Sequence, residues 1–98
     1  MIVADISVIP MGAGPGTSVS PIVQKAVRAL QARGLRTLTG PMSTSFEAPT
    51  LDEVLAGAKA AHMAAVEAGA RRVITIIKID DRRDKEQSMD SKMAAVNR

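Results

Sequence analysis

The sequence contains no cysteine, tryptophan or tyrosine, and its only aromatic residue is Phe46. Without cysteine the chain cannot form disulfides, thiolate metal sites or a cysteine nucleophile. This composition fits a reducing compartment, so we expect a cytoplasmic protein. The only histidine, His62, falls in the middle of an expected helix, where a packed or surface position is typical. We therefore expect no metal site, no cofactor and no catalytic residue.

Long apolar runs are also missing, since none reaches the roughly 18 residues that a membrane-spanning helix requires. The chain starts with an early acid, Asp5, and has no basic segment before it, so we expect neither a signal peptide nor a membrane partner. The formal net charge is only +3. Opposite charges alternate from Asp80 to Lys85, which is typical of salt bridges or a solvated turn and indicates an anionic partner only weakly.

Apolar residues, in contrast, make up 46% of the 98 positions. That share excludes a disordered tail and predicts one small domain over residues 1–98. A domain of this size buries a smaller fraction of its surface than a larger one does, and it often gains stability by oligomerising.

The spacing of apolar residues predicts the order strand, helix, strand in the first half of the chain. The expected elements are a strand over residues 2–9, a helix from residue 18 or 20 to 33, and a strand over residues 35–39. Pro10 is expected to end the first strand, because proline lacks the N–H that a central strand needs. Gly34 is the expected C-terminal cap of the helix.

The same order returns in the second half. The expected elements are a strand over residues 42–48, a helix from residue 50 to Gly69, a strand over residues 72–80 and a short helix over residues 88–96. Thr50 and Glu53 have the spacing of a capping box at the start of the longer helix. The last helix is too short to be stable alone, so we expect the tail, residues 86–98, to dock on its own domain or on a neighbouring subunit.

This order predicts the ferredoxin-like βαββαβ sandwich, an α+β fold with one four-stranded antiparallel sheet and both helices on one face. The first and last strands are apolar on both faces; in the last strand Ile74 and Ile76 oppose Thr75 and Ile77. Two helices can cover only one face of such a sheet. We therefore expect the other face to be covered by something else, most economically a second copy of the chain.

A glycine-rich segment, residues 12–18, separates the first strand from the first helix. It does not match a phosphate-binding loop, because Thr17 occupies the place of the third glycine and no lysine is present. The simpler interpretation is a flexible connection. Thr17 and Ser18 could still offer hydroxyls or amides at a helix N-terminus, where donors are unpaired.

Small hydroxyl residues, an aromatic and a carboxylate gather at the middle of the chain, over residues 40–47. Because side chains alternate along a strand, Met42, Thr44 and Phe46 should share one face and Glu47 should lie on the other. This pattern is compatible with the polar lining of a small-molecule pocket. From residue types alone, it is more typical of an ordinary half-exposed strand.

Four segments, in order, resemble the thiamine-binding-protein family of small YkoF-like proteins. They are residues 1–10, 17–20, 40–44 and 72–85, and the run Ile79–Lys85 is the most specific of them. The resemblance covers residues 1–93. It implies a ferredoxin-like fold, a homotetramer built as a dimer of dimers with sheets facing each other, and binding of thiamine or its hydroxymethylpyrimidine part as a carrier or sensor without enzymatic activity.

The resemblance also implies where the ligand would bind. The implied pocket uses Thr17 and Ser18 together with Thr44 and Glu47 of the central strand. Such a pocket needs an apolar wall, which Met42, Phe46 or Met11 could supply. The sequence departs from the family at Phe46, where an aliphatic residue is common, and at residues 48–49, where a glycine often follows the acid. A carboxylate such as Glu47 could accept from the amino group of an aminopyrimidine, and the hydroxyls could donate or accept.

Two other classes of function remain open from the sequence. Ferredoxin-like sheets also serve RNA-binding modules, but those modules stack bases on strand aromatics, and this chain has a single aromatic residue. An enzyme would have to rely on Glu47, Asp5 or His62, because no nucleophile–base pair, metal cluster or cofactor fingerprint occurs in the sequence. We therefore expect a binding protein with no nucleic-acid partner.

Overall fold

The computed structural model describes residues 1–12 and 19–97. The elements are β1 (Ile2–Met11), α1 (Ser20–Ala32), β2 (Arg36–Thr39), β3 (Thr44–Ala48), α2 (Leu51–Glu67), β4 (Arg72–Asp80) and α3 (Met89–Val96). The predicted order of elements is confirmed. No helix in the described ranges is both long and apolar enough to cross a bilayer.

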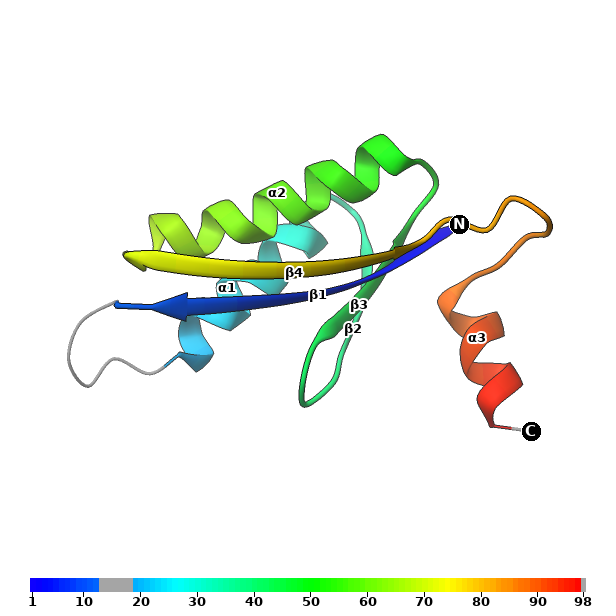
Figure 1. Cartoon of the computed structure of the whole chain (residues 1–98), viewed down its shortest axis with the longest axis horizontal. Coiled ribbons are helices and arrows are strands. Elements are labelled where there is room, and N and C mark those ends of the chain that lie inside the picture. The colour runs from blue at the N-terminus through cyan, green and yellow to red at the C-terminus, as the bar shows by residue number, and fades with distance from the viewer. Residues whose placement is uncertain (13–18, 98) are drawn as a thin grey trace.

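The four strands form one antiparallel sheet in the order β2-β3-β1-β4. The helices α1 and α2 lie together on one face, and α3 is set apart beyond the end of the sheet where β1 begins and β4 ends (Figure 1). This arrangement is the predicted ferredoxin-like sandwich with a short C-terminal helix. We call the sheet face turned away from α1 and α2 the open face.

The core lies between the sheet and the two long helices. Register places Ala4 of β1 between Phe46 of β3 and Ile79 of β4, all on the helix side. The largest side chains that are fully buried come from all three layers of this core: Phe46, Leu30 of α1 and Val54 of α2. The only aromatic ring of the chain is therefore in the core.

β1 continues two residues past its expected end at Ile9. Residues 10 and 11 still pair with β4, and the Met11 carbonyl accepts a hydrogen bond from the Arg71 N–H at 3.0 Å. Successive residues point their N–H and C=O groups to opposite edges of a strand, so Pro10 faces the edge away from β4. There β3 pairs only as far as Ile6. The prediction that Pro10 ends the strand was wrong, because its missing donor faces no neighbouring strand.

The ends of the helices are capped by residues whose types suit those positions. Gly34 follows α1 with φ +76°, a conformation that favours glycine, and its N–H donates to the Gln31 carbonyl at 2.9 Å. The Thr50 hydroxyl accepts from the Glu53 N–H at 3.2 Å and caps α2. Ser88 and Ser91 form a reciprocal capping box at the start of α3.

Gly57 marks the closest approach of α2 to the core. A Cβ atom added there would lie 2.7 Å from Leu35 Cδ1 and 3.2 Å from Leu30 Cδ2. Both leucine side chains are buried, so neither can move into solvent to make room. The missing side chain is therefore what lets α2 pack this deeply against α1 and the sheet.

We expect Gly57→Val to lower the free energy of unfolding by about 2 kcal/mol or more, since overpacking a dense core costs roughly 1–3 kcal/mol and valine adds further bulk. The control is Lys59→Val, which places the same β-branched side chain on an exposed position of the same helix without the clash. Urea unfolding measures both. Equal losses in the two variants would show that the tight approach at Gly57 has no energetic role.

Candidate functional site

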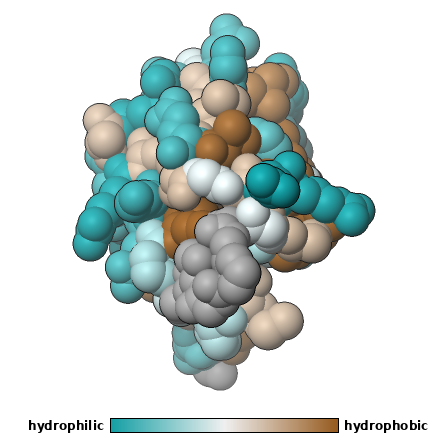
Figure 2. Space-filling view, turned by 90° about the vertical axis from the view of Figure 1, so that its left-hand side faces the viewer, coloured by the Kyte–Doolittle hydropathy of each residue, from teal (hydrophilic) through white to brown (hydrophobic). Residues whose placement is uncertain are grey.

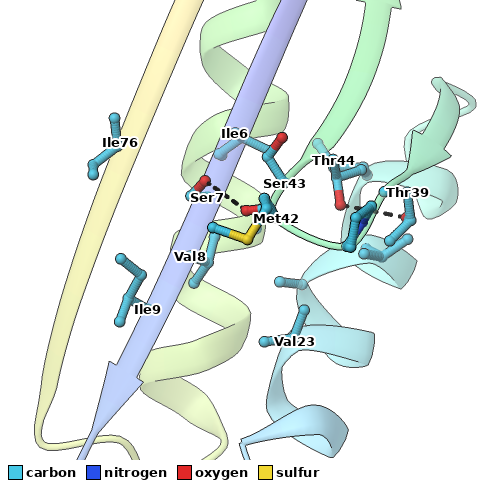
Figure 3. Close-up of a pocket in the computed structure, with 16 residues that line it drawn as sticks. Ile6, Ser7, Val8, Ile9, Val23, Thr39, Met42, Ser43, Thr44 and Ile76 are labelled. Carbon is cyan, nitrogen blue, oxygen red and sulfur yellow. Dashed lines mark hydrogen bonds between the residues drawn. The ribbon is translucent and has the colours of Figure 1, made fainter.

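A pocket of about 530 Å³ lies between β1, α1 and the turn that joins β2 to β3. It exists because β3 is shorter than the strand it pairs with: the last β1–β3 pair is Ile6 with Thr44, whereas β1 runs on along β4 to Met11. The turn at residues 40–43 and the side of α1 border the edge of β1 that β3 leaves uncovered (Figure 3).

The walls of the pocket are mainly aliphatic. Val23, Ala26 and Val27 of α1 face Ile6 and Val8 of β1 across it. Figure 2 looks at the end of the molecule where β1 finishes and α1 begins, and it shows apolar surface gathered at the centre of that end with hydrophilic side chains around it. An aliphatic pocket with a few polar groups is the usual form of a small-molecule site.

The polar groups of the pocket are hydroxyls. The Thr39 and Thr44 hydroxyls are hydrogen-bonded to each other at 3.3 Å, and the Ser7 hydroxyl donates a long bond of 3.4 Å to the Met42 carbonyl (Figure 3). A pair of hydroxyls uses one hydrogen for the mutual bond. Within residues 1–12 and 19–97, the second hydrogen and several lone pairs have no other partner and remain for a ligand.

The structure brings together two of the six predicted ligand-binding residues. Thr44 and Met42 both line the pocket; Thr44 is almost fully buried, and Met42 is 86% exposed at its mouth. Thr17 and Ser18 lie outside the described residues. The other two, Phe46 and Glu47, are not among the described residues that line the pocket.

Phe46 is directed into the core and is completely buried. The ring lies beside Gly57, with Cε2 3.6 Å from the position of an added Cβ. The expected stacking of this ring on a ligand is therefore not supported, because the ring already packs between the sheet and α2. For the same reason no aromatic side chain lies on the open face, where an RNA-binding module would need one.

Glu47 belongs to the open face, on the opposite side of the sheet from Phe46. Its carboxylate is almost fully buried, and Oε1 accepts a hydrogen bond from the Met89 N–H at 3.0 Å. Met89 is the first residue of α3, where backbone donors are unpaired and negative charge is favourable. Glu47 thus holds the N-terminus of α3 through Oε1 of the carboxylate that the family resemblance assigned to a ligand.

Three further polar contacts hold α3 and the segment before it against the sheet. The Arg36 guanidinium makes two bonds to the Asp90 carboxylate, at 2.9 and 2.8 Å. The Gln87 amide donates to the Asp80 carbonyl at 2.7 Å, and Lys92 pairs with the Asp80 carboxylate. The hydrogen bond from Arg36 holds the pKa of Asp90 below its ordinary value, and Lys92 lowers the pKa of Asp80 in the same way.

Outside the pocket, the other polar residues considered as candidates are paired with neighbouring side chains. His62 Nδ1 lies 2.7 Å from the Thr75 hydroxyl, between α2 and β4. Asp81 and Asp84 pair with Arg83 and Arg82, as the alternating charges predicted. Among residues 1–12 and 19–97, no group of three or more histidine, aspartate or glutamate side chains gathers to hold a metal ion.

Sequence reasoning missed most of the pocket. Ser7, Thr39 and the α1 residues Val23 and Val27 line it, yet each fits an ordinary amphipathic element by residue type. The signal that would have found them is the mismatch in strand length, since a ten-residue strand paired with a five-residue one must leave part of its edge uncovered. The sequence instead predicted strands of nearly equal length, over residues 2–9 and 42–48, and the structure begins the second of these only at Thr44. To use this mismatch one must know the β1–β3 register, which cannot be derived from residue types.

The open face carries apolar side chains that α3 does not cover. Ile9, Leu38 and Ile76 are 40, 51 and 59% exposed there. Asp5, near the middle of this face, has one buried carboxylate oxygen without a hydrogen-bond partner in the described structure. The prediction that the first and last strands are apolar on both faces is confirmed at Ile9 and Ile76.

Comparison with known proteins relates the chain to one family. The sequence pattern of the family described as "Thiamine-binding protein" matches residues 4–97. A UPF0045 protein of Methanothermobacter thermautotrophicus is 44% identical over 96 residues, covering 98% of this chain and 96% of the relative. The UPF0045 protein YqgV of Bacillus subtilis is 39% identical over 102 residues, covering 100% of this chain and 96% of the relative.

Solved structures agree with the fold. A hypothetical protein from Methanocaldococcus jannaschii superposes with a TM-score of 0.86 at 38% identity, covering 98% of this chain and 95% of that one. A candidate thiamine biosynthesis/salvage protein from Thermotoga maritima gives 0.78 at 18% identity, covering 97% of both chains. At that identity the second likeness shows the fold alone.

We expect the contact of α3 with the sheet to weaken as the pH falls below about 3.8, the ordinary value for Asp80 and Asp90. Their pKa is lower in the folded state, so they stabilise it above the ordinary value and lose that contribution as the pH falls through the lowered one. Hydrogen exchange of the α3 amides measures this. In Asp90→Asn the acid dependence should be smaller, and an unchanged dependence would contradict the assignment.

Proposed function

Because the chain belongs to the thiamine-binding protein family, we propose that it binds thiamine or its hydroxymethylpyrimidine part in the pocket between β1, α1 and the β2–β3 turn. The observation that carries the proposal is the pocket itself, which is large enough for a small heterocycle and lined by aliphatic walls with hydroxyls at one end. The ligand contacts we propose are the Thr44 hydroxyl and the Met42 side chain.

The proposed role is binding without catalysis, in a cytoplasmic carrier or sensor. Among the described residues, no base is shown bonded to the Thr44 or Ser7 hydroxyl, since Thr44 pairs with Thr39 and Ser7 donates to a carbonyl. His62, the only histidine, bonds to Thr75 and is not among the residues that line the pocket. Nucleophilic catalysis needs such a base within hydrogen-bond reach.

Titration calorimetry with thiamine tests the binding site. We expect saturable binding, and we expect Thr44→Val to weaken it about two- to tenfold, the value of one neutral hydrogen bond of roughly 0.5–1.5 kcal/mol. Valine has nearly the shape of threonine, so the pocket should keep its volume.

The matched control is Thr37→Val. Thr37 lies on the same sheet face beside Phe46 and bonds to Gln31, outside the described lining of the pocket. Loss of the Thr37 hydroxyl should leave the affinity for thiamine unchanged. Glu47→Gln separates two site assignments: strong weakening there, with no effect of Thr44→Val, would place the ligand on the open face and remove the pocket assignment.

We further propose that the chain forms a homotetramer, a dimer of dimers in which the open face of one copy covers that of another. The exposed apolar side chains Ile9, Leu38 and Ile76 support this arrangement, because burying them removes apolar surface from water. The face also holds the unpartnered oxygen of Asp5, which a second copy could satisfy.

Light scattering tests the assembly with Ile74→Lys, which places a charge on the open face opposite Ile9 and outside the pocket lining. We expect the variant to have a lower mass than the wild type, because a buried, unpaired ammonium is strongly unfavourable. Leu55→Lys, on an exposed position of α2, should keep the wild-type mass. A monomeric wild type, or an unchanged mass in Ile74→Lys, would refute an interface on this face.

A further inference from the structure

The pocket is not confined to the helix side of the sheet. Its lining includes Ile6 and Val8 of β1, which lie on the helix side, and also Ile9 of β1 and Ile76 of β4, which belong to the open face. Side chains alternate between the two faces of a strand, so a cavity lined by consecutive residues of β1 must pass around the edge of that strand. This edge is uncovered where β3 has ended. The pocket therefore extends onto the open face.

Large apolar side chains border the pocket on the open face. Met42, in the turn between β2 and β3, is largely exposed, and so are Ile9 and Ile76 on the sheet. The Ser7 hydroxyl, which also belongs to the open face, donates to the Met42 carbonyl and ties the turn to β1 (Figure 3). In a single chain, the mouth of the pocket is thus an apolar rim in contact with water, as at an unoccupied interaction surface.

The charges of the open face suit a second copy of the same face. Asp5 has a buried carboxylate oxygen without a partner in the described structure. Its register partner in β4 is Lys78, which is exposed. A two-fold axis brings the same patch to both sides of an interface, so each group of one copy meets its complement on the other. With the axis near this pair, the Lys78 ammonium of one copy can bind the Asp5 carboxylate of the other, and the reverse.

We propose that a second copy of the chain, packed on the open face, closes the mouth of the pocket over Met42, Ile9 and Ile76. Subunit association then completes the binding site. A ligand in the closed pocket is shielded from water on a side that a single chain leaves open, so the ligand binds the assembled form more tightly. Ligand binding and association therefore strengthen each other by the same factor. This inference rests on the proposed function, and it adds how assembly regulates the site.

Titration calorimetry with thiamine tests the linkage in two variants of the open face, Ile74→Lys and Lys78→Glu. Neither residue is among the described residues that line the pocket. The first variant places an ammonium in an apolar interface, and the second places an acid opposite Asp5. We expect each variant to dissociate and to bind thiamine at least about fivefold more weakly than the wild type, because coupling between sites is typically 5- to 150-fold. Leu55→Lys, on an exposed position of α2, is the control and should keep the wild-type mass and affinity.

Oxidation by dilute hydrogen peroxide, followed by mass spectrometry of the peptides, locates the interface. Met42 should react more slowly in the assembled wild type than in the two variants, because the second copy covers it. Met63, on an exposed part of α2, should react at the same rate in all of them. Met89 is buried, so rapid oxidation there identifies an unfolded variant. Since Lys78 is exposed, Lys78→Glu keeps the test decisive where Ile74→Lys does not fold.

Each contrary outcome has a separate meaning. Dissociated variants that bind thiamine with wild-type affinity, or a Met42 that reacts equally fast in the assembled wild type, would overturn the inference and leave thiamine binding standing. A wild-type mass in both variants would refute the interface and the inference with it. A wild type that binds no thiamine would refute the proposed function, and the linkage would fall with it.

Discussion

The mismatch between β1 and β3 is the constraint on which the rest of the site depends. β1 has ten residues and β3 has five, so the ladder between them stops at the pair Ile6–Thr44. Beyond that pair the sheet keeps its second ladder, with β4, and therefore stays rigid. The uncovered edge, the room beside α1 and the tolerance of Pro10 in a central strand all follow from the same early end of β3.

Much of the fold could be predicted from the sequence, because buried apolar residues recur with the spacing of a helix or a strand. Alternation over Arg72–Asp80 gave the bounds of β4 as the structure has them, and glycine and threonine gave the helix ends at Gly34 and Thr50. Pro10 misled, since a missing donor matters only where a neighbouring strand exists, and the sequence does not say which edge is paired. The residue type shows which backbone hydrogen bonds a position can make. The neighbouring strands decide which of these hydrogen bonds the fold requires.

The candidate site was harder to predict from the sequence for a related reason. Thr44 and Glu47 were expected in the pocket from the family resemblance, and Met42 and Phe46 as its apolar wall. Thr44 and Met42 line the pocket, whereas Phe46 and Glu47 are used elsewhere. The ring of Phe46 fills the core beside Gly57, and the carboxylate of Glu47 holds α3. A buried acid is informative only once its partner is known. Here that partner is a backbone N–H 42 residues further along the chain, a distance at which no local pattern indicates a contact.

The contact between Glu47 and Met89 also sets an order of events during synthesis. The sandwich of sheet and two helices is complete in sequence once Asp80 has left the ribosome, but the carboxylate on its open face then still lacks the N–H that it accepts from. A nascent chain stalled before Met89 would carry this carboxylate beside Arg36, its register partner in β2, without the N–H that it accepts from in the folded structure. The start of α3 thus completes the surroundings of a carboxylate that β3 contributes to the open face.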